Sequence, residues 1–209
     1  MTRLRRDDSG FTLIELLMAI VIVGIITVPL ANVFFGFLRG ADDTTARLSE
    51  SHDLQIAAAY WAGDVASIGT RDTTSPYALK QSVETGPAYN FGLYPCGAEG
   101  TPDAIVRLAF DNFTGDGTGT LVRIAYVVRT VSGRTELHRL RCQGSSAVVS
   151  DITLAHDLDP STPPALTCSS TCTAAPVVPM TVTLTLTLKD PKNQGAAWSA
   201  SLTGQRRQS

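Results

Sequence analysis

Glu15 is the residue whose position most clearly implies chemistry, because it is the only charged residue among the 28 positions from Phe11 to Leu38. A run of 18 or more apolar residues is long enough to cross a bilayer as a helix. A carboxylate costs roughly 2.5–3.5 kcal/mol near the centre of such a span, and less near its edge. A cation that meets the carboxylate in a low-dielectric setting offsets this penalty. Glu15 therefore predicts a functional site with a cationic partner.

The four cysteines form the second group of reactive residues. Cys96, Cys142, Cys168 and Cys172 all follow the apolar run, and four cysteines allow three pairings. The sequence favours Cys96–Cys142 and Cys168–Cys172, of which the second closes the short loop CSSTC. A zinc site using all four is an alternative, but paired C-x2-C spacing is absent. Redox catalysis would need C-x-x-C, which is absent as well.

Other polar residues have the right types for catalysis or metal binding but the wrong spacing. His156 and Asp157 have no serine nucleophile in an elbow motif to complete a hydrolase triad. Asp111 and Asp116 lie in the glycine-rich segment DNFTGDGTGT, which departs from the EF-hand spacing. A lone His138 does not make a metal site. We therefore expect no enzyme activity, no metal and no cofactor.

A basic hairpin raises the question of nucleic-acid binding. It carries five arginines, at positions 123, 129, 134, 139 and 141. However, no set of aromatic residues for base stacking accompanies them, and the net charge of the chain is −2. We expect the arginines and His138 to lie on the solvated outer face of a sheet, and nucleic acid is not favoured as a partner.

The segment GFTLIELL, from Gly10 to Leu17, closely resembles the cleavage and methylation motif of type IV pilins and type II secretion pseudopilins. The resemblance implies that a prepilin peptidase and methyltransferase cuts the Gly10–Phe11 bond and methylates the new amino terminus of Phe11. It also implies that Glu15 assists assembly by pairing with the terminal amine of a neighbouring subunit. A secretory signal peptide would have a shorter apolar region of about 7–15 residues, and an ordinary anchor has no use for Glu15.

Charge near the amino terminus predicts the orientation in the membrane. Three arginines precede the apolar run, Arg3, Arg5 and Arg6, and basic residues flanking a span stay in the cytoplasm. We therefore expect a single-pass protein of the cytoplasmic (inner) membrane with a cytoplasmic leader and an exported carboxyl-terminal domain. After cleavage the subunit would enter a cell-surface or periplasmic filament. Disulfides fit that oxidising location.

The chain divides into four predicted segments. Residues 1–10 form the leader, and 11–40 form a transmembrane and filament-core helix with Pro29 inside it. The segment 41–69 is predicted as an amphipathic helix that resumes after the polar residues 42–45, and its stripe Leu54, Ala58, Trp61, Val65 and Ile68 faces one side. Glu50, Asp53 and Asp64 lie off this stripe. Residues 70–209 form a β-rich exported domain.

Alternating apolar residues predict the strands of that domain. We expect strands over 88–94, 104–110, 122–129, 135–142, 152–154, 181–189 and 198–203, with irregular segments at 69–87 and 159–179 and a turn at 190–195. The hairpin that contains Trp198 should cover the Trp61 stripe and bury both tryptophans. The predicted fold class is α+β, with the long amino-terminal helix packed on an antiparallel sheet.

Together these features predict a minor pilin or minor pseudopilin that assembles with other pilins through its amino-terminal helix and rests in membrane lipid beforehand. The alternative is an uncleaved single-pass membrane protein with an exported β-rich binding domain. An exported hydrolase is a third hypothesis, but the sequence has no nucleophile motif for it.

Overall fold

The computed structural model describes residues 10, 12–74, 76, 78–113, 119–173, 178–189 and 197–207, without the side chains of residues 42, 43, 46 and 47. It has one long helix, α1 (Leu13–Ser67), followed by β1 (Thr70–Arg71), β2 (Leu79–Lys80), β3 (Val83–Thr85), β4 (Ala104–Phe113), β5 (Gly119–Val131), β6 (Arg134–Gln143), β7 (Val148–Ala155), β8 (Ala165–Cys168), β9 (Thr181–Leu188) and β10 (Trp198–Gln205). The fold is α+β, as predicted. The chain divides into two compact units, and the boundary in the sequence falls between Leu48 and Ser49.

The helix α1 continues through the polar segment 42–45, where the sequence suggested a pause. The hydroxyls of Thr44 and Thr45 donate to the carbonyls of Gly40 and Ala41, both at 2.9 Å. A threonine hydroxyl that donates to the carbonyl four residues earlier has its hydrogen bond inside the helix. It therefore does not act as the cap of a second helix. Pro29 also lies inside α1, although it lacks the N–H that would complete the backbone ladder.

The larger sheet of the second unit is an antiparallel meander in the order β3-β4-β5-β6-β7. The predicted hairpin of β5 and β6 is confirmed, with Val122 opposite Gln143 and Tyr126 opposite Arg139. Its turn at Ser132 and Gly133 has positive φ at both positions, 50° and 81°. That conformation matches the twist of the flanking strands and fixes their register.

A smaller sheet has the order β10-β9-β8, and β1 pairs with β2. In β9 the side chains of Val182, Leu184, Leu186 and Leu188 are fully buried, while the threonines between them are not. This alternation follows from the two-residue period of a strand. The strand β8 falls in the segment 159–179, which was expected to be irregular, and pairing with β9 brings it into the sheet.

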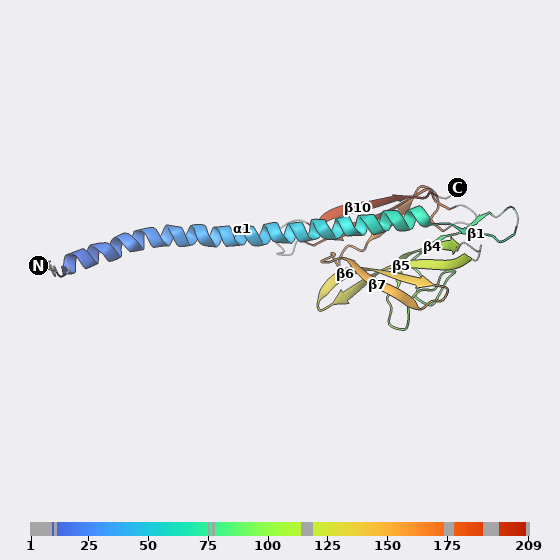
Figure 1. Cartoon of the computed structure of the whole chain (residues 1–209), viewed down its shortest axis with the longest axis horizontal. Coiled ribbons are helices and arrows are strands. Elements are labelled where there is room, and N and C mark those ends of the chain that lie inside the picture. The colour runs from blue at the N-terminus through green and yellow to red at the C-terminus, as the bar shows by residue number, and fades with distance from the viewer. Residues whose placement is uncertain are drawn as a thin grey trace, which may run out of the picture. The chain divides into compact units, whose positions relative to one another are not determined.

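From Ser49 onward, α1 lies between the two sheets, with β10 on one side and β5 and β6 on the other (Figure 1). The Trp61 ring packs against Tyr126 of β5 with 4.9 Å between ring centroids, and its Nε1 donates to the carbonyl of Val182 in β9 at 3.1 Å. Trp61, Val65 and Ile68 are fully buried. The predicted apolar stripe therefore forms the core, but it is covered from two sides.

Other local predictions are wrong as well. The segment 69–87, expected to be irregular, contains β1, β2 and β3. Residues 88–94 form an irregular segment, because Arg107 and Glu84 bind its backbone groups, as described below. Trp198 remains 40% exposed. It is the first residue of β10, and its partner Leu188 is the last residue of β9, so the indole lies at the end of the sheet. The predicted turn at 190–195 lies outside the described residues.

Candidate functional site

Glu15 lies in the first turn of α1 and is bound to Thr12. Its Oε2 accepts the backbone N–H of Thr12 at 3.0 Å and the Thr12 hydroxyl at 2.9 Å. The N–H of Glu15 points back to Thr12 Oγ1 at 3.4 Å. This reciprocal arrangement is a capping box. In it, the side chains of a threonine and of a glutamate three residues later each accept a hydrogen bond from the other residue's backbone N–H at the start of the helix. The Glu15 carboxylate therefore has two donors within its own chain.

Thr12 is a partner of Glu15 that was not predicted. The signal was present, since Thr12-Leu13-Ile14-Glu15 fits the pattern Ser/Thr-x-x-Glu before an apolar run. Of the two predicted processing residues, Gly10 is exposed and immediately precedes Phe11. Phe11 lies outside the described residues.

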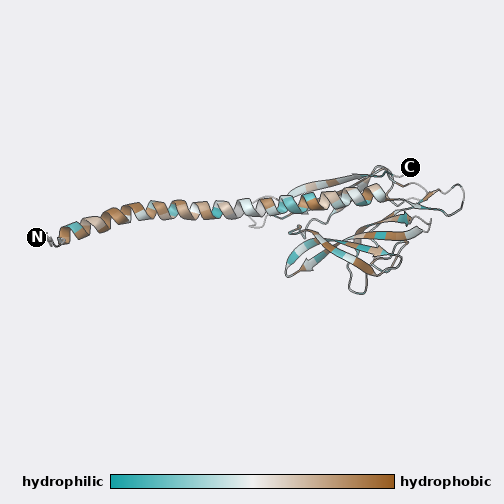
Figure 2. Cartoon of the chain, in the orientation of Figure 1, coloured by the Kyte–Doolittle hydropathy of each residue, from teal (hydrophilic) through white to brown (hydrophobic). Residues whose placement is uncertain are grey.

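The segment Leu13–Ala41 is a helix of 29 residues that is long and apolar enough to cross a membrane. Its side chains are not buried within the chain: Leu13 is 81% exposed, Val33 70% and Phe37 71%. Figure 2 shows hydrophobic residues around this part of α1, in contrast to the mixed surface further along. A helix that is apolar all round needs lipid or other apolar helices around it.

Both disulfides that the sequence favoured are present. Cys96 and Cys142 are joined with an S–S distance of 2.02 Å, and Cys168 and Cys172 with 2.09 Å. The first bond is buried together with Ala104, Ala125, Val127 and Leu140, which form a small second core. That core lies on the face of β5 opposite the main core, since Val122, Ile124 and Tyr126 belong to the latter. The disulfide thus fastens the segment before β4 over the outer face of the sheet.

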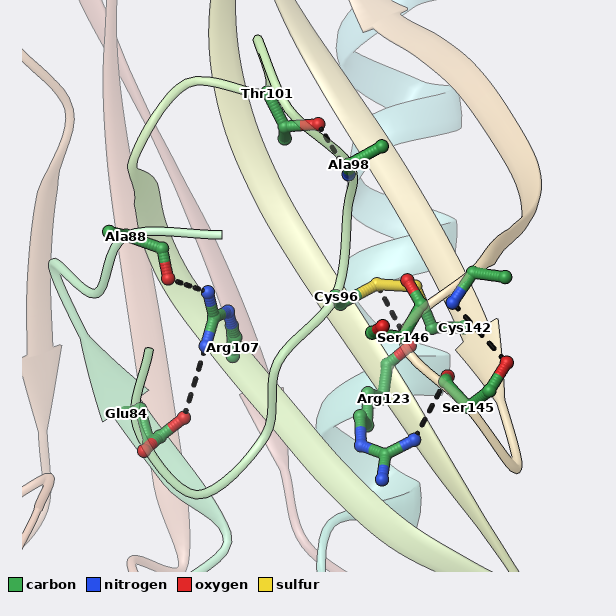
Figure 3. Close-up of a disulfide and its surroundings, with 11 residues drawn as sticks. Glu84, Ala88, Cys96, Ala98, Thr101, Arg107, Arg123, Cys142, Ser145 and Ser146 are labelled. Atoms are coloured by element: carbon green, nitrogen blue, oxygen red, sulfur yellow. Dashed lines mark hydrogen bonds and ion pairs between the residues drawn. A yellow bond between two sulfur atoms is a disulfide. The ribbon is translucent and has the colours of Figure 1, made fainter. Parts of the chain in front are cut away.

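A buried arginine shapes the same segment (Figure 3). The side chain of Arg107 is fully buried, and its guanidinium donates to the carbonyls of Ala88 and Phe91. Glu84 lies 3.6 Å from Arg107 and accepts the N–H groups of Leu93 and Tyr94 at 2.5 and 3.1 Å. Burial lowers the pKa of Arg107, and the charge of Glu84 opposes that change. Because these backbone groups bond to side chains, they do not pair as a strand.

Asp64 lies within the main core, although the sequence placed it off the buried stripe. Its Oδ2 and Oδ1 accept from Nε and Nη2 of Arg139, both at 2.6 Å, and the Tyr126 hydroxyl donates to Oδ2 at 2.7 Å. Burial raises the pKa of Tyr126 well above its ordinary value, and the neighbouring Asp64 charge raises it further. This network joins α1 to β5 and β6 through charge-assisted bonds.

The prediction that the arginines and His138 share one solvated outer face is wrong. Arg139 and His138 are each only 8% exposed. Neighbouring residues in a strand point to opposite faces, so Arg139 cannot share a face with its neighbour His138. Arg139 shares its face with its cross-strand partner Tyr126, and both meet Asp64.

Comparison with known proteins identifies one feature of this chain. The family model described as the prokaryotic N-terminal methylation motif matches residues 5–31. This motif is the signature of type IV pilins and pseudopilins, and it includes Gly10, Phe11 and Glu15. A comparison with curated proteins finds no match to the chain.

Proposed function

We propose that this chain, which carries the methylation motif at residues 5–31, is a minor pilin or minor pseudopilin. A prepilin peptidase cleaves it after Gly10 and methylates Phe11. The mature subunit then leaves the membrane and joins a filament, either a type IV pilus or a type II secretion pseudopilus. Its exported domain acts by assembly and contact, without catalysis.

The position of Glu15 carries this proposal. The carboxylate lies at the start of a 29-residue apolar helix, where its hydrogen-bond donors among the described residues are the N–H and hydroxyl of Thr12. Neither group carries a positive charge, so the carboxylate has no counterion among the residues that the structure describes. An amine from a neighbouring subunit would supply one, and ion pairs in low dielectric are favourable when their remaining hydrogen bonds are satisfied. The hydrogen bonds from Thr12 therefore lower the cost of burying Glu15 in a subunit that is still in the membrane. The amine of a neighbouring subunit then favours assembly.

The exposed apolar helix supports the same function. Closely packed helices of other subunits can replace lipid around its side chains, as van der Waals packing does between membrane helices. A filament grows when each subunit contacts the next through a heterologous, non-closing interface. A single anchored receptor would need the apolar helix but not the carboxylate.

Mass spectrometry of the native amino terminus tests the processing step. We expect a chain that begins with methylated Phe11, and Gly10→Val should leave the leader attached by blocking the peptidase. A native protein that retains Met1 and Arg3 would instead support the uncleaved single-pass protein with an exported binding domain.

Filament isolation tests the role of Glu15 separately. Glu15→Ala should still be cleaved, but its incorporation into sheared filaments should fall at least tenfold, because no charge is left to attract the amine. Thr27→Ala is the matched control, since Thr27 lies in the same helix and its hydroxyl donates to the Val23 carbonyl of that helix. Normal incorporation of Glu15→Ala would remove Glu15 from the mechanism.

A further inference from the structure

The strand β10 has one paired edge and one free edge. Its residues Trp198–Gln205 pair one by one with Thr181–Leu188 of β9, without a register shift. In the part of the chain that the structure describes, β9 is the only strand beside β10. Just beyond the strand, the N–H of Arg206 donates to the Met180 carbonyl at 2.8 Å and continues the same ladder. This bond shows which residues of β10 bond to β9.

The alternation of an antiparallel ladder then assigns the outward groups. Every second residue bonds to the neighbouring strand, and the residues between them direct both N–H and C=O to the other side. Counting back from Arg206, the outward residues are Ser199, Ser201, Thr203 and Gln205. All four are exposed, and no hydrogen bond to their backbone groups is found among the other described residues. The free edge therefore offers N–H and C=O groups at intervals of about 6.8 Å.

The other sheet edges of the second unit are short or irregular. The strands β1 and β2 have two residues each, β3 has three and β8 has four. The strand β7 is as long as β10, but its ladder with β6 shifts register twice, and it contains Asp151, which pairs with Arg129. Short strands, bulges and charges are the means by which proteins prevent pairing at an edge. Since β10 has no charge, no proline and no register shift, its edge is open to a further strand.

The strand β9 shows which side-chain pattern fits beside β10. On the exposed face, hydroxyls of the two strands bond in three pairs: Thr183 with Thr203 at 3.0 Å, Thr185 with Ser201 at 3.3 Å, and Thr187 with Ser199 at 3.2 Å. On the buried face, Leu184 lies opposite Leu202. Neither strand contains a charged residue. A further strand with the same alternation would again place hydroxyls beside hydroxyls and apolar side chains beside apolar ones, and such cross-strand pairs stabilise a sheet.

Trp198 provides an apolar contact for such a strand. It belongs to the same alternation as the buried Leu202, but it remains 40% exposed. An apolar side chain at this end of an added strand would cover part of the indole, and burying apolar surface favours binding.

We propose that the free edge of β10 binds an extended, uncharged segment of another protein as an additional antiparallel strand. The main chain of that segment bonds to the four outward residues of β10, and its side chains alternate between hydroxyl and apolar types. In strand addition the main-chain bonds give affinity and the alternating side chains give specificity. The proposal does not depend on filament assembly, because an exported domain of an uncleaved protein would have the same edge.

A second copy of this chain fits the edge less well. Antiparallel pairing of two β10 edges relates the copies by a two-fold axis. Because α1 runs alongside β10 in the second unit (Figure 1), the two α1 segments from Ser49 onward would then run in opposite directions. Two subunits anchored in one membrane enter their exported domains from the same side, so a segment of a different protein is the better occupant.

Hydrogen exchange of single backbone amides, followed by NMR on the mature full-length protein in detergent, tests the proposal. The probe is the synthetic peptide TVTLTLTLK, the sequence of residues 181–189, because β9 shows that this pattern pairs with β10. Without peptide, the amides of Ser199, Ser201 and Thr203 should exchange fast and those of Ala200 and Leu202 slowly. When the peptide occupies about nine-tenths of the chains, exchange at the outward amides should slow about tenfold, because only the free chains exchange. The inward amides should not change.

Two modified peptides provide a matched control. In the aligned pairing, the hydroxyl residues of both strands lie opposite each other, so the threonine N–H groups of the peptide face β10. N-methylation of the three internal threonines should therefore abolish the protection. N-methylation of the three leucines alters the other edge of the peptide and should leave the protection in place.

Variants of the protein test the same edge from the other side. Ser201→Pro removes one outward N–H, and proline is tolerated in an edge strand where its missing N–H faces solvent. It should weaken peptide binding about twofold to tenfold, the value of one hydrogen bond, whereas Ser201→Ala should bind nearly as the unaltered chain. Ser201→Lys keeps the N–H and should also weaken binding, because a charge at an edge opposes pairing. Slow exchange at Leu202 reports that each variant is folded.

Four results would overturn the proposal. Outward amides that already exchange slowly in the chain alone would show that the edge is covered. Protection that rises with protein concentration without peptide would identify a second copy as the occupant. Equal slowing at inward and outward amides would indicate general stabilisation, and equal protection by the two N-methylated peptides would show that the peptide binds elsewhere.

Discussion

Replacing Asp64 by alanine should destabilise the second unit more than any surface substitution. The change leaves the Arg139 guanidinium without its carboxylate in a site where the arginine side chain is only 9% exposed. Breaking a buried ion pair by removing one partner costs about 3–5 kcal/mol. Tyr126 also loses its acceptor, but the two losses belong to one network and should not be added. We expect Asp64→Ala to lower the free energy of unfolding by about 3–5 kcal/mol.

Urea denaturation of the full chain in detergent, monitored by tryptophan fluorescence, measures this loss of stability. Trp61 reports on it because it lies one turn from Asp64 and is fully buried. The matched control is Asp72→Ala. Asp72 and its partner Lys80 are 40% and 54% exposed, and exposed pairs contribute about 0–1 kcal/mol.

A double variant tests the cause. Asp64→Ala combined with Arg139→Met removes both charges, and replacing a buried pair by apolar residues is often nearly neutral. We therefore expect the double variant to recover most of the lost stability. The reasoning is refuted if Asp64→Ala costs less than about 1 kcal/mol, the size of a surface pair. It is also refuted if the double variant is no more stable than Asp64→Ala, since the loss would then come from the cavity.

Two further predictions concern the fold. Cys96→Ser should lower the free energy of unfolding by about 4 kcal/mol and Cys168→Ser by about 2 kcal/mol. The entropy cost of closing a loop grows with its length, and the paired cysteines are 46 and 4 residues apart. Equal losses of stability in denaturant titrations of the two variants would contradict this. Gly204→Ala should destabilise by about 1–3 kcal/mol through overpacking, since its new Cβ would lie 2.5 Å from Val65 Cβ. Gly63→Ala meets nothing within 4 Å and should stabilise the helix by about 0.5–1 kcal/mol, so thermal unfolding should shift the two variants in opposite directions.

Local sequence patterns predicted those parts of the molecule in which a residue mainly contacts residues close to it in the chain. The helix, the β5–β6 hairpin and the alternation in β9 depend on periods of a few residues. Even the Thr12–Glu15 capping box, which was overlooked, could have been found from four consecutive residues. The segment 88–94 failed because its backbone partners are the side chains of Arg107 and Glu84, and no periodic pattern records such bonds.

The burial of charge could not be predicted in the same way. Asp64 and Arg139 are 75 residues apart, and each looks like an ordinary surface residue in its own segment. Trp61 and Trp198 have the same side chain, but only Trp61 is enclosed, because it lies between two sheets while Trp198 lies at the end of one. Likewise, His138 and His156 meet Glu136 only because β6 and the end of β7 are brought side by side.

The sequence by itself determined the processing motif, the length of the apolar helix and the place of Glu15 at its start, because cleavage signals and membrane spans are read along a continuous stretch of chain. The tertiary structure alone decided that the part of α1 from Ser49 onward lies between two sheets, that Asp64 pairs with Arg139, and that His138 and His156 both face Glu136. These facts depend on which distant segments meet. The free energy of a buried charge is set by the partners that folding brings to it, and not by its neighbours in the chain.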